Sequence, residues 1–243
     1  DAFRRAPAEV PDGLAGAAHD GYLAAAAALA LWRPERAVIA DAMRQAGLRM
    51  VMLKGAALAG WLYTDAASRP IGDLDILVAE SELGPAAGVL AALGYVRADP
   101  EAEAWQHHWV FAREVAHGVA ITVELHRRAM ASPPYDRLLD ADDLLDRSIE
   151  LPIAESTDVG LRGCRTVQGV AAAWRVPALV DCLLHLAGHL VLQHAGEERL
   201  IWVSDIHRVA RAGREDPVFW LQVCERAEAA RLARSVADAL RMS

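Results

Sequence analysis

One short segment of the chain alternates apolar and polar residues with the period of a β-strand. In residues 73–78 (DLDILV) the even-numbered positions are apolar and would point to one side of an extended strand, whereas Asp73 and Asp75 would point to the other. A mostly apolar strand is typical of a sheet interior, where charged side chains are rare. The pattern therefore predicts a buried strand that presents two carboxylates at one place.

A second segment, residues 119–126 (VAITVELH), alternates in the same way. Its positions 121, 123 and 125 are apolar, and Thr122, Glu124 and His126 share the opposite face. Residues 50–53 form a continuous apolar run that predicts another buried strand. Further strand candidates are residues 105–111 and short strands within 149–167.

Helical patterns flank these strands. On the N-terminal side we predict a loosely ordered lead-in over residues 1–20 and two helices over 22–31 and 34–47, with Pro34 in a first turn and Gly47 as the terminator. Further helices are predicted over 56–63, 81–93, 135–147, 177–193 and 199–211, and Asp216-Pro217 opens another.

This order of elements predicts a mixed α/β (α+β) fold. We expect an N-terminal helical segment over residues 1–47, a small mixed-sheet core over 48–170 and a C-terminal helical subdomain over 171–243. From about residue 171 onward the chain is predicted to be helical to its end.

The composition excludes several classes of protein. With 243 residues, 54% hydrophobic and 24% charged, the chain is too apolar to be disordered. A net charge of −8 argues against binding nucleic acid through bulk electrostatics, and the pairs Arg4-Arg5 and Arg127-Arg128 are interpreted as solvated surface. The chain has no uninterrupted run of about 18 apolar residues and no signal-peptide core, so we expect a cytoplasmic protein without a membrane span.

Asp73 and Asp75 form a candidate metal site. Two carboxylates on one strand face repel each other, and a divalent cation removes that penalty. Mg²⁺ is held by one or two carboxylates together with phosphate oxygens of a substrate. Glu124 is the natural third ligand, because it lies on the polar face of the other alternating strand. The alternative interpretation is a solvated strand face without a metal.

Lys54 and Gly55 form a candidate phosphate site at a predicted strand-to-helix turn. Lys54 is the only lysine among the 25 basic residues, and its compact ammonium can neutralise a phosphate that the turn's free N–H groups attract. Arg69 either reaches the same charge or packs on its own turn. His126 lines an acceptor pocket, orients a carboxylate or bonds to a neighbouring strand.

Residues 53–78 (LKGAALAGWLYTDAASRPIGDLDILV) and 123–126 (VELH) resemble a largely uncharacterised bacterial nucleotidyltransferase family of the DNA polymerase β superfamily. That family's motif has the form LKG, a helix, and then R-P-x-x-D-h-D-h-L-V. The resemblance implies transfer of a nucleoside monophosphate from an NTP, with ATP expected, to an acceptor with loss of pyrophosphate. It also implies that two Mg²⁺ ions are held by the three acids Asp73, Asp75 and Glu124, which carry catalysis, and that Lys54 and Gly55 anchor the triphosphate.

One departure and two alternatives accompany this resemblance. The wider superfamily's Gly-Gly or Gly-Ser turn is Lys-Gly here, so a serine that contacts the triphosphate in those relatives is missing. The histidines of the C-terminal half suggest a metal-dependent phosphohydrolase instead, although no H-E-x-x-H is present; they are His185, His189, His194 and His207. A nucleotide-binding pseudoenzyme is the other alternative.

The acceptor is expected to be a small molecule, a peptide or protein, or an RNA end. The C-terminal helices are expected to form the wall on the acceptor side, with Asp205 in contact with Arg199.

Overall fold

The computed structural model describes residues 12–98, 107–116, 118–131, 135–152, 173–194, 197 and 199–243. The predictions for residues 1–11, for 105–106 and for strands within 153–167 lie outside the described residues, as does the pair Arg4-Arg5.

Five strands form a mixed sheet in the order β1-β2-β5-β4-β3. The parallel pair β2–β5 lies at its centre, and the other neighbours are antiparallel. The structure therefore has the mixed α/β class that the sequence predicts. The strands are β1 (Val51–Met52), β2 (Leu74–Leu77), β3 (Val96–Arg97), β4 (His108–Ala116) and β5 (Val119–His126).

A separate two-stranded sheet corrects one prediction. Strand β6 (Ile149–Pro152) does not complete the main sheet but pairs with β7 (Ala173–Val176), which lies in the segment predicted to be helical. The side chains of β7 alternate in burial, with Trp174 and Val176 inside the core. This strand is only four residues long and follows two alanines, so its alternation is too short to outweigh the helical composition around it.

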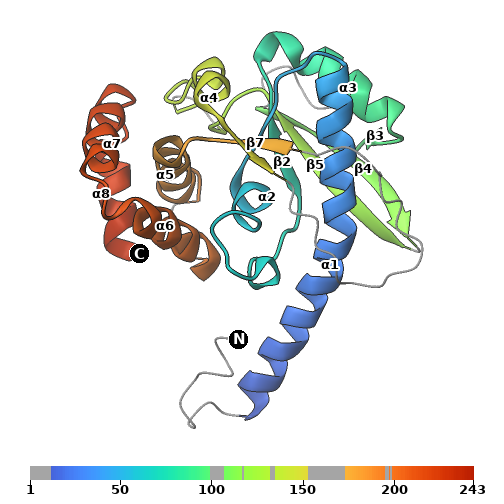
Figure 1. The fold of residues 1–243 in the computed structure, drawn as a ribbon, viewed down its shortest axis with the longest axis horizontal. Helices are drawn as coiled ribbons and strands as arrows, with labels where there is room; N and C mark the ends of the chain where they lie inside the picture. Colours follow the sequence, from blue (N-terminus) through green and yellow to red (C-terminus); the bar gives the residue numbers. More distant parts are fainter. Residues whose placement is uncertain are drawn as a thin grey trace.

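One long helix, α1 (Asp12–Gln45), replaces the two predicted N-terminal helices. Pro34 lies inside this helix. A proline there removes one backbone hydrogen bond, and the packing of the following turns compensates for that loss. Ile39 and Met43 in those turns are fully buried. Gly47 terminates the helix as predicted, with a φ of 71° and its N–H donating to the Arg44 carbonyl. The first turns of α1 extend away from the rest of the protein (Figure 1), whereas farther along the helix the Tyr22 hydroxyl donates to Asp65 Oδ2.

The same helix bears on the expectation that the chain has no membrane span. Among the described residues, Gly13–Gln45 is long and apolar enough to cross a membrane by length and composition, and 11% of its most apolar window is buried. Signal sequences and core helices of soluble proteins satisfy the same criterion, so it does not establish a location.

The remaining helices surround the sheet. Helix α2 is shorter than predicted, since Gly60 follows it closely, and α4 begins six residues later than predicted. Asp216 caps α7 as predicted, with its side chain accepting from the Val218 N–H. The helices are α2 (Lys54–Leu58), α3 (Leu83–Ala92), α4 (Ala141–Arg147), α5 (Leu179–Gly188) continued by a π-helical turn (His189–Gln193), α6 (Leu200–Gly213), α7 (Pro217–Ala229) and α8 (Ala233–Met242).

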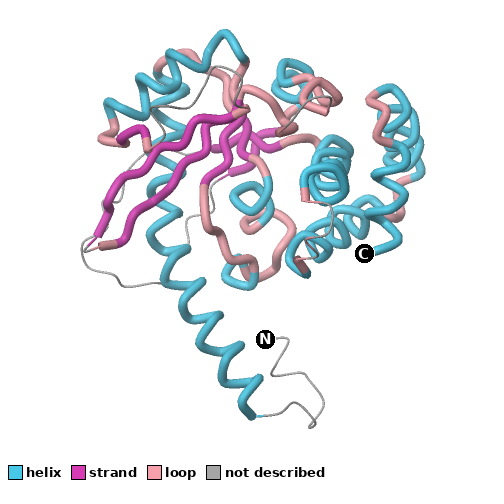
Figure 2. Tube along the Cα trace, turned by 180° about the vertical axis from the view of Figure 1, so that it is seen from behind, coloured by secondary structure: helices cyan, strands magenta, loops and turns pink. Residues whose placement is uncertain are grey.

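Both faces of the sheet are packed. Leu74, Ile76 and Val123 belong to a hydrophobic cluster with α1 and α3, whereas Leu77 belongs to a second cluster with α5–α8. The two groups of helices lie on different sides of the strands (Figures 1 and 2). Because side chains alternate along a strand, Asp75 has the parity of Leu77 and faces the side of the C-terminal helices.

Candidate active site

The register of the two central strands brings two of the predicted acids together. Asp75 on β2 is paired with Glu124 on the parallel strand β5. One ligand atom each of Asp75, Glu124 and His126 lies within 4.8 Å of the other two. Asp73, just before β2, is half-buried and feels the negative charge of both acids, but it lies outside this close group.

Two side chains bond to the Asp75 carboxylate. The Lys54 Nζ donates to Asp75 Oδ1 at 2.6 Å, and His126 Nε2 lies 3.0 Å from the same oxygen. His126 Nε2 is also 3.3 Å from Glu124 Oε2, so this histidine orients both carboxylates. Asp75 is 1% exposed, and a buried carboxylate requires such partners.

Lys54 reaches Asp75 from a strained backbone position. Its φ is 47°, in the left-handed region that costs a non-glycine residue about 1–3 kcal/mol. The chain passes there from β1 into α2, and this conformation directs the ammonium toward the acids. The single lysine of the chain therefore lies at the centre of the predicted site.

The three carboxyl groups differ in their pKa. Burial alone would raise the pKa of Asp75, but the Lys54 ammonium and the bond with His126 hold it well below its usual range. The hydrogen bond with His126 also lowers the pKa of Glu124. Burial, followed by the charges of Asp75 and Glu124, raises the pKa of Asp73 to about 6. At neutral pH all three acids are ionised, and Asp73 is the first to take up a proton.

Arg69 is held by a buried acid of the C-terminal helices. Its Nε and Nη2 donate to the carboxylate oxygens of Asp205 on α6 at 2.7–3.1 Å, and the Tyr63 hydroxyl donates to the same carboxylate at 2.6 Å. The predicted contact between Asp205 and Arg199 is wrong. Asp205 is fully buried and faces inward, whereas the Arg199 guanidinium lies over the Trp202 ring.

Gly55 is required by Arg69. A Cβ at position 55 would lie 2.7 Å from Arg69 Nη1, so the guanidinium fills the space that a side chain would need. The resemblance implies that Gly55 helps to anchor a triphosphate, whereas its open side in this structure faces Arg69. Helix α2 has only five residues, so attraction of a phosphate at this turn depends mainly on the Lys54 ammonium.

A Gly55→Ala variant is expected to lose about 1–3 kcal/mol of the free energy of unfolding, because the Arg69 guanidinium must leave its position on Asp205. Gly88→Ala is the matched control: its Cβ would meet nothing within 4 Å inside α3, and alanine favours helix by up to about 1 kcal/mol. Urea unfolding of the two variants measures the difference. Equal stability of both would contradict the assigned packing.

Two histidines that the sequence analysis did not single out lie beside this group. His108 on β4 is paired with His126 on β5, and His107 precedes it. The sequence shows a His-His pair within a strand candidate. The pair indicates a site only once the antiparallel register places it beside residue 126.

The C-terminal histidines have other partners. His185 Nε2 lies 3.1 Å from the Ala129 carbonyl oxygen, and burial lowers the pKa of this histidine to about 3. His189 and His194 pack against the Trp202 ring. Within the part of the chain that the structure describes, none of the groups able to ligate a metal includes these histidines. The described residues therefore do not show the histidine metal cluster on which the phosphohydrolase alternative depends.

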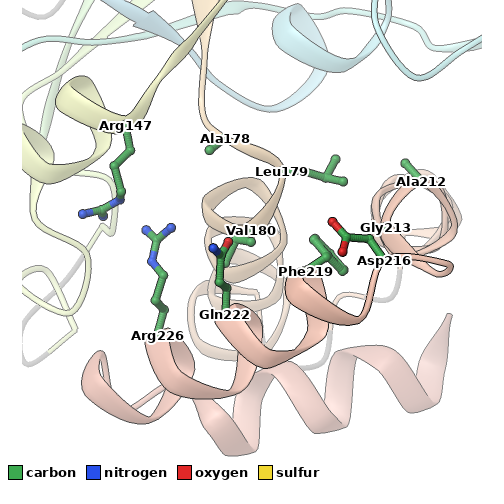
Figure 3. Close-up of a pocket in the computed structure, with 10 residues that line it drawn as sticks. All are labelled: Arg147, Ala178, Leu179, Val180, Ala212, Gly213, Asp216, Phe219, Gln222 and Arg226. Atoms are coloured by element: carbon green, nitrogen blue, oxygen red, sulfur yellow. The ribbon is translucent and has the colours of Figure 1, made fainter.

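A cavity of about 440 Å³ lies among α4, α5, α6 and α7 and includes none of the predicted site residues (Figure 3). Its two arginines, Arg147 and Arg226, both contact the buried carboxylate of Asp181, which neutralises part of their charge. The cavity is therefore separate from the acids on β2 and β5.

A family model described as uncharacterised nucleotidyltransferase matches residues 4–243. No curated protein matches the sequence. An antigenic nucleotidyltransferase-like protein from Paracoccidioides brasiliensis is similar in structure, with a TM-score of 0.48 and 10% identity over 88% of this chain and 93% of that one. The antibiotic-resistance factor ANT(2'')-Ia has a TM-score of 0.49 and 12% identity, over 84% and 91% respectively.

Proposed function

The chain belongs to the family of uncharacterised nucleotidyltransferases, and from this premise we propose that it transfers a nucleoside monophosphate from an NTP to an acceptor hydroxyl. ATP is the expected donor and pyrophosphate the leaving group. The observation that carries the proposal is the placement of Asp75 beside Glu124 on the two central parallel strands, next to Asp73 and the Lys54 ammonium. In this proposal the protein acts in the cytoplasm, and its acceptor is a small molecule, a peptide or protein, or an RNA end.

The donor set fits a hard divalent cation. Carboxylate oxygens are the ligands that Mg²⁺ prefers, and Asp75 and Glu124 offer theirs within 4.8 Å of each other. Asp73, Asp75 and Glu124 would hold the two ions of the proposal. When bound, Mg²⁺ supplies positive charge to the attacking and leaving oxygens of an in-line displacement.

The protein's own side chains have separate roles in this proposal. The acceptor oxygen attacks the α-phosphorus, the bond to the β-phosphate breaks, and the hydroxyl proton passes to a base, for which Glu124 is the candidate. Lys54 neutralises phosphate oxygens that approach the acids. His126 keeps the two paired carboxylates oriented. Arg69, bound to Asp205, acts as a positioning residue behind Gly55.

Incubation with Mg²⁺ and each α-labelled NTP in turn tests the proposal. We expect pyrophosphate release that stops on chelation of the metal, with label transferred to a small molecule, a protein or an RNA supplied as acceptor. Nucleotide binding without consumption under all of these conditions would favour the pseudoenzyme alternative instead.

The affinity for Mg²⁺ is expected to fall as the pH drops below about 6. A proton and the metal compete for the Asp73 carboxylate, whose pKa is raised to about 6, whereas Asp75 and Glu124 keep their charge. Below that pH the affinity decreases by up to about tenfold per pH unit. Mn²⁺ binding followed by electron paramagnetic resonance measures it. In Asp73→Asn the dependence near pH 6 should disappear; its persistence would contradict the assignment.

A further inference from the structure

Three histidines converge beside the carboxylates, at the end of β5 and the start of β4. A ligand atom of each of His107, His108 and His126 lies within 4.8 Å of the other two. His108 Nδ1 is 2.7 Å from His107 Nε2, and the ring centroids of the three pairs are 4.2, 4.9 and 5.4 Å apart. The β4–β5 register, which pairs residue 108 with residue 126, fixes this arrangement.

The nitrogens of this cluster lie close enough to converge on one ion. His107 and His108 are half-buried, and their facing nitrogens are in direct contact. Neutral imidazoles have a lone pair available for a metal. The contact between His107 and His108 satisfies one nitrogen of each ring, and an ion bound by both would take the place of this hydrogen bond.

His126 adds an independent observation. The residue is 3% exposed, its Nε2 is held by Asp75 and Glu124, and its Nδ1 has no hydrogen-bond partner among the described residues. A buried polar nitrogen without a partner costs about 1–3 kcal/mol. Histidines that ligate metals commonly have one nitrogen bonded to a carboxylate, which fixes the ring and leaves the other for the ion.

We propose that His107, His108 and His126 form a binding site for a divalent transition metal, with Zn²⁺ as the ion that fits best. Three imidazole nitrogens with a fourth position open to solvent or substrate are an established zinc ligand set. Nitrogen donors favour zinc and similar ions over Mg²⁺, whereas the neighbouring carboxylates favour Mg²⁺. The two sites therefore differ in donor chemistry and share His126 as the contact between them.

Occupancy of this site would affect the carboxylate site through one residue. His126 bonds to both Asp75 and Glu124, so an ion on His126 fixes the ring that orients them and adds positive charge nearby. The proposal does not depend on nucleotidyl transfer, because the ligands and the ion define it without a nucleotide.

Zinc binding to the purified full-length chain, without nucleotide, tests the proposal. Competition with a chromophoric chelator gives the affinity, and the visible spectrum of bound Co²⁺ reports on nitrogen coordination. We expect one ion per chain and a loss of affinity of at least about 10–100-fold in His107→Gln and in His108→Gln, since even partners outside the ligand set change affinity by that amount.

Two control variants separate this site from others. His194→Gln removes a histidine that packs on Trp202 and should bind zinc as tightly as the unmodified chain. Asp73→Asn reports whether the carboxylates, instead of the histidines, hold the ion. Urea unfolding confirms that each variant is folded. Absence of zinc binding, retention of full affinity in both His107→Gln and His108→Gln, or loss of affinity in Asp73→Asn but in neither histidine variant would overturn the proposal.

Discussion

An Asp75→Asn variant is expected to lose nucleotidyl transfer by about 1,000-fold or more. Asparagine keeps the size of the side chain but removes the negative charge of Asp75, which lies beside Glu124 on the neighbouring strand β5. Metal-based stabilisation of a transition state amounts to several kcal/mol, and each 1.4 kcal/mol corresponds to about a factor of ten in rate. Pyrophosphate release under saturating Mg²⁺ and NTP measures the loss.

The control for this variant is an acid that lies away from the site. Glu114 on β4 is exposed and accepts a hydrogen bond from the Gly118 N–H, so Glu114→Gln should retain the activity of the unmodified chain. Asp75→Asn also leaves Lys54 and His126 with a neutral partner, so its folded fraction is measured in parallel by circular dichroism. Unchanged turnover in folded Asp75→Asn would refute the catalytic role of Asp75.

The centre of the fold was predictable because its signal is local. Alternation with a period of two marks residues 73–78 and 119–126, and the structure has strands within the first range and over all of the second. The parity of each strand then determines that Asp75 and Glu124 lie on the same face. The excess of arginine over lysine indicated that Lys54 occupies a special position, and its ammonium lies 2.6 Å from Asp75.

The parts that could not be predicted depend on contacts between distant residues. Arg69 and Asp205 are separated by 136 positions, and nothing near either residue indicates that they bind each other. The continuation of α1 through Pro34 could not be predicted either, because a proline can lie in the first turn of a helix or interrupt a longer helix. The choice is made by packing: Arg36 is buried, donates to the Ala56 carbonyl and lies over the Trp174 ring.

An Asp205→Ala variant is expected to reduce the free energy of unfolding by about 3–5 kcal/mol. The substitution leaves the buried Arg69 guanidinium without its carboxylate and removes the acceptor of the Tyr63 hydroxyl. Removal of one partner from a buried ion pair has a cost of this size, because the remaining charge stays away from water. For a chain of this length the melting temperature should fall by about 10 °C.

Two further variants make this expectation specific to the buried pair. Asp238→Ala breaks an exposed ion pair with Arg241 on α8 and should change stability by less than about 1 kcal/mol. The double variant Arg69→Met/Asp205→Leu should recover most of the stability that Asp205→Ala loses, because replacing both charges with apolar side chains removes the desolvation penalty. Urea unfolding of all three variants is the measurement. If the free energy of unfolding falls no further in Asp205→Ala than in Asp238→Ala, the ion pair between the loop before β2 and α6 does not stabilise the fold.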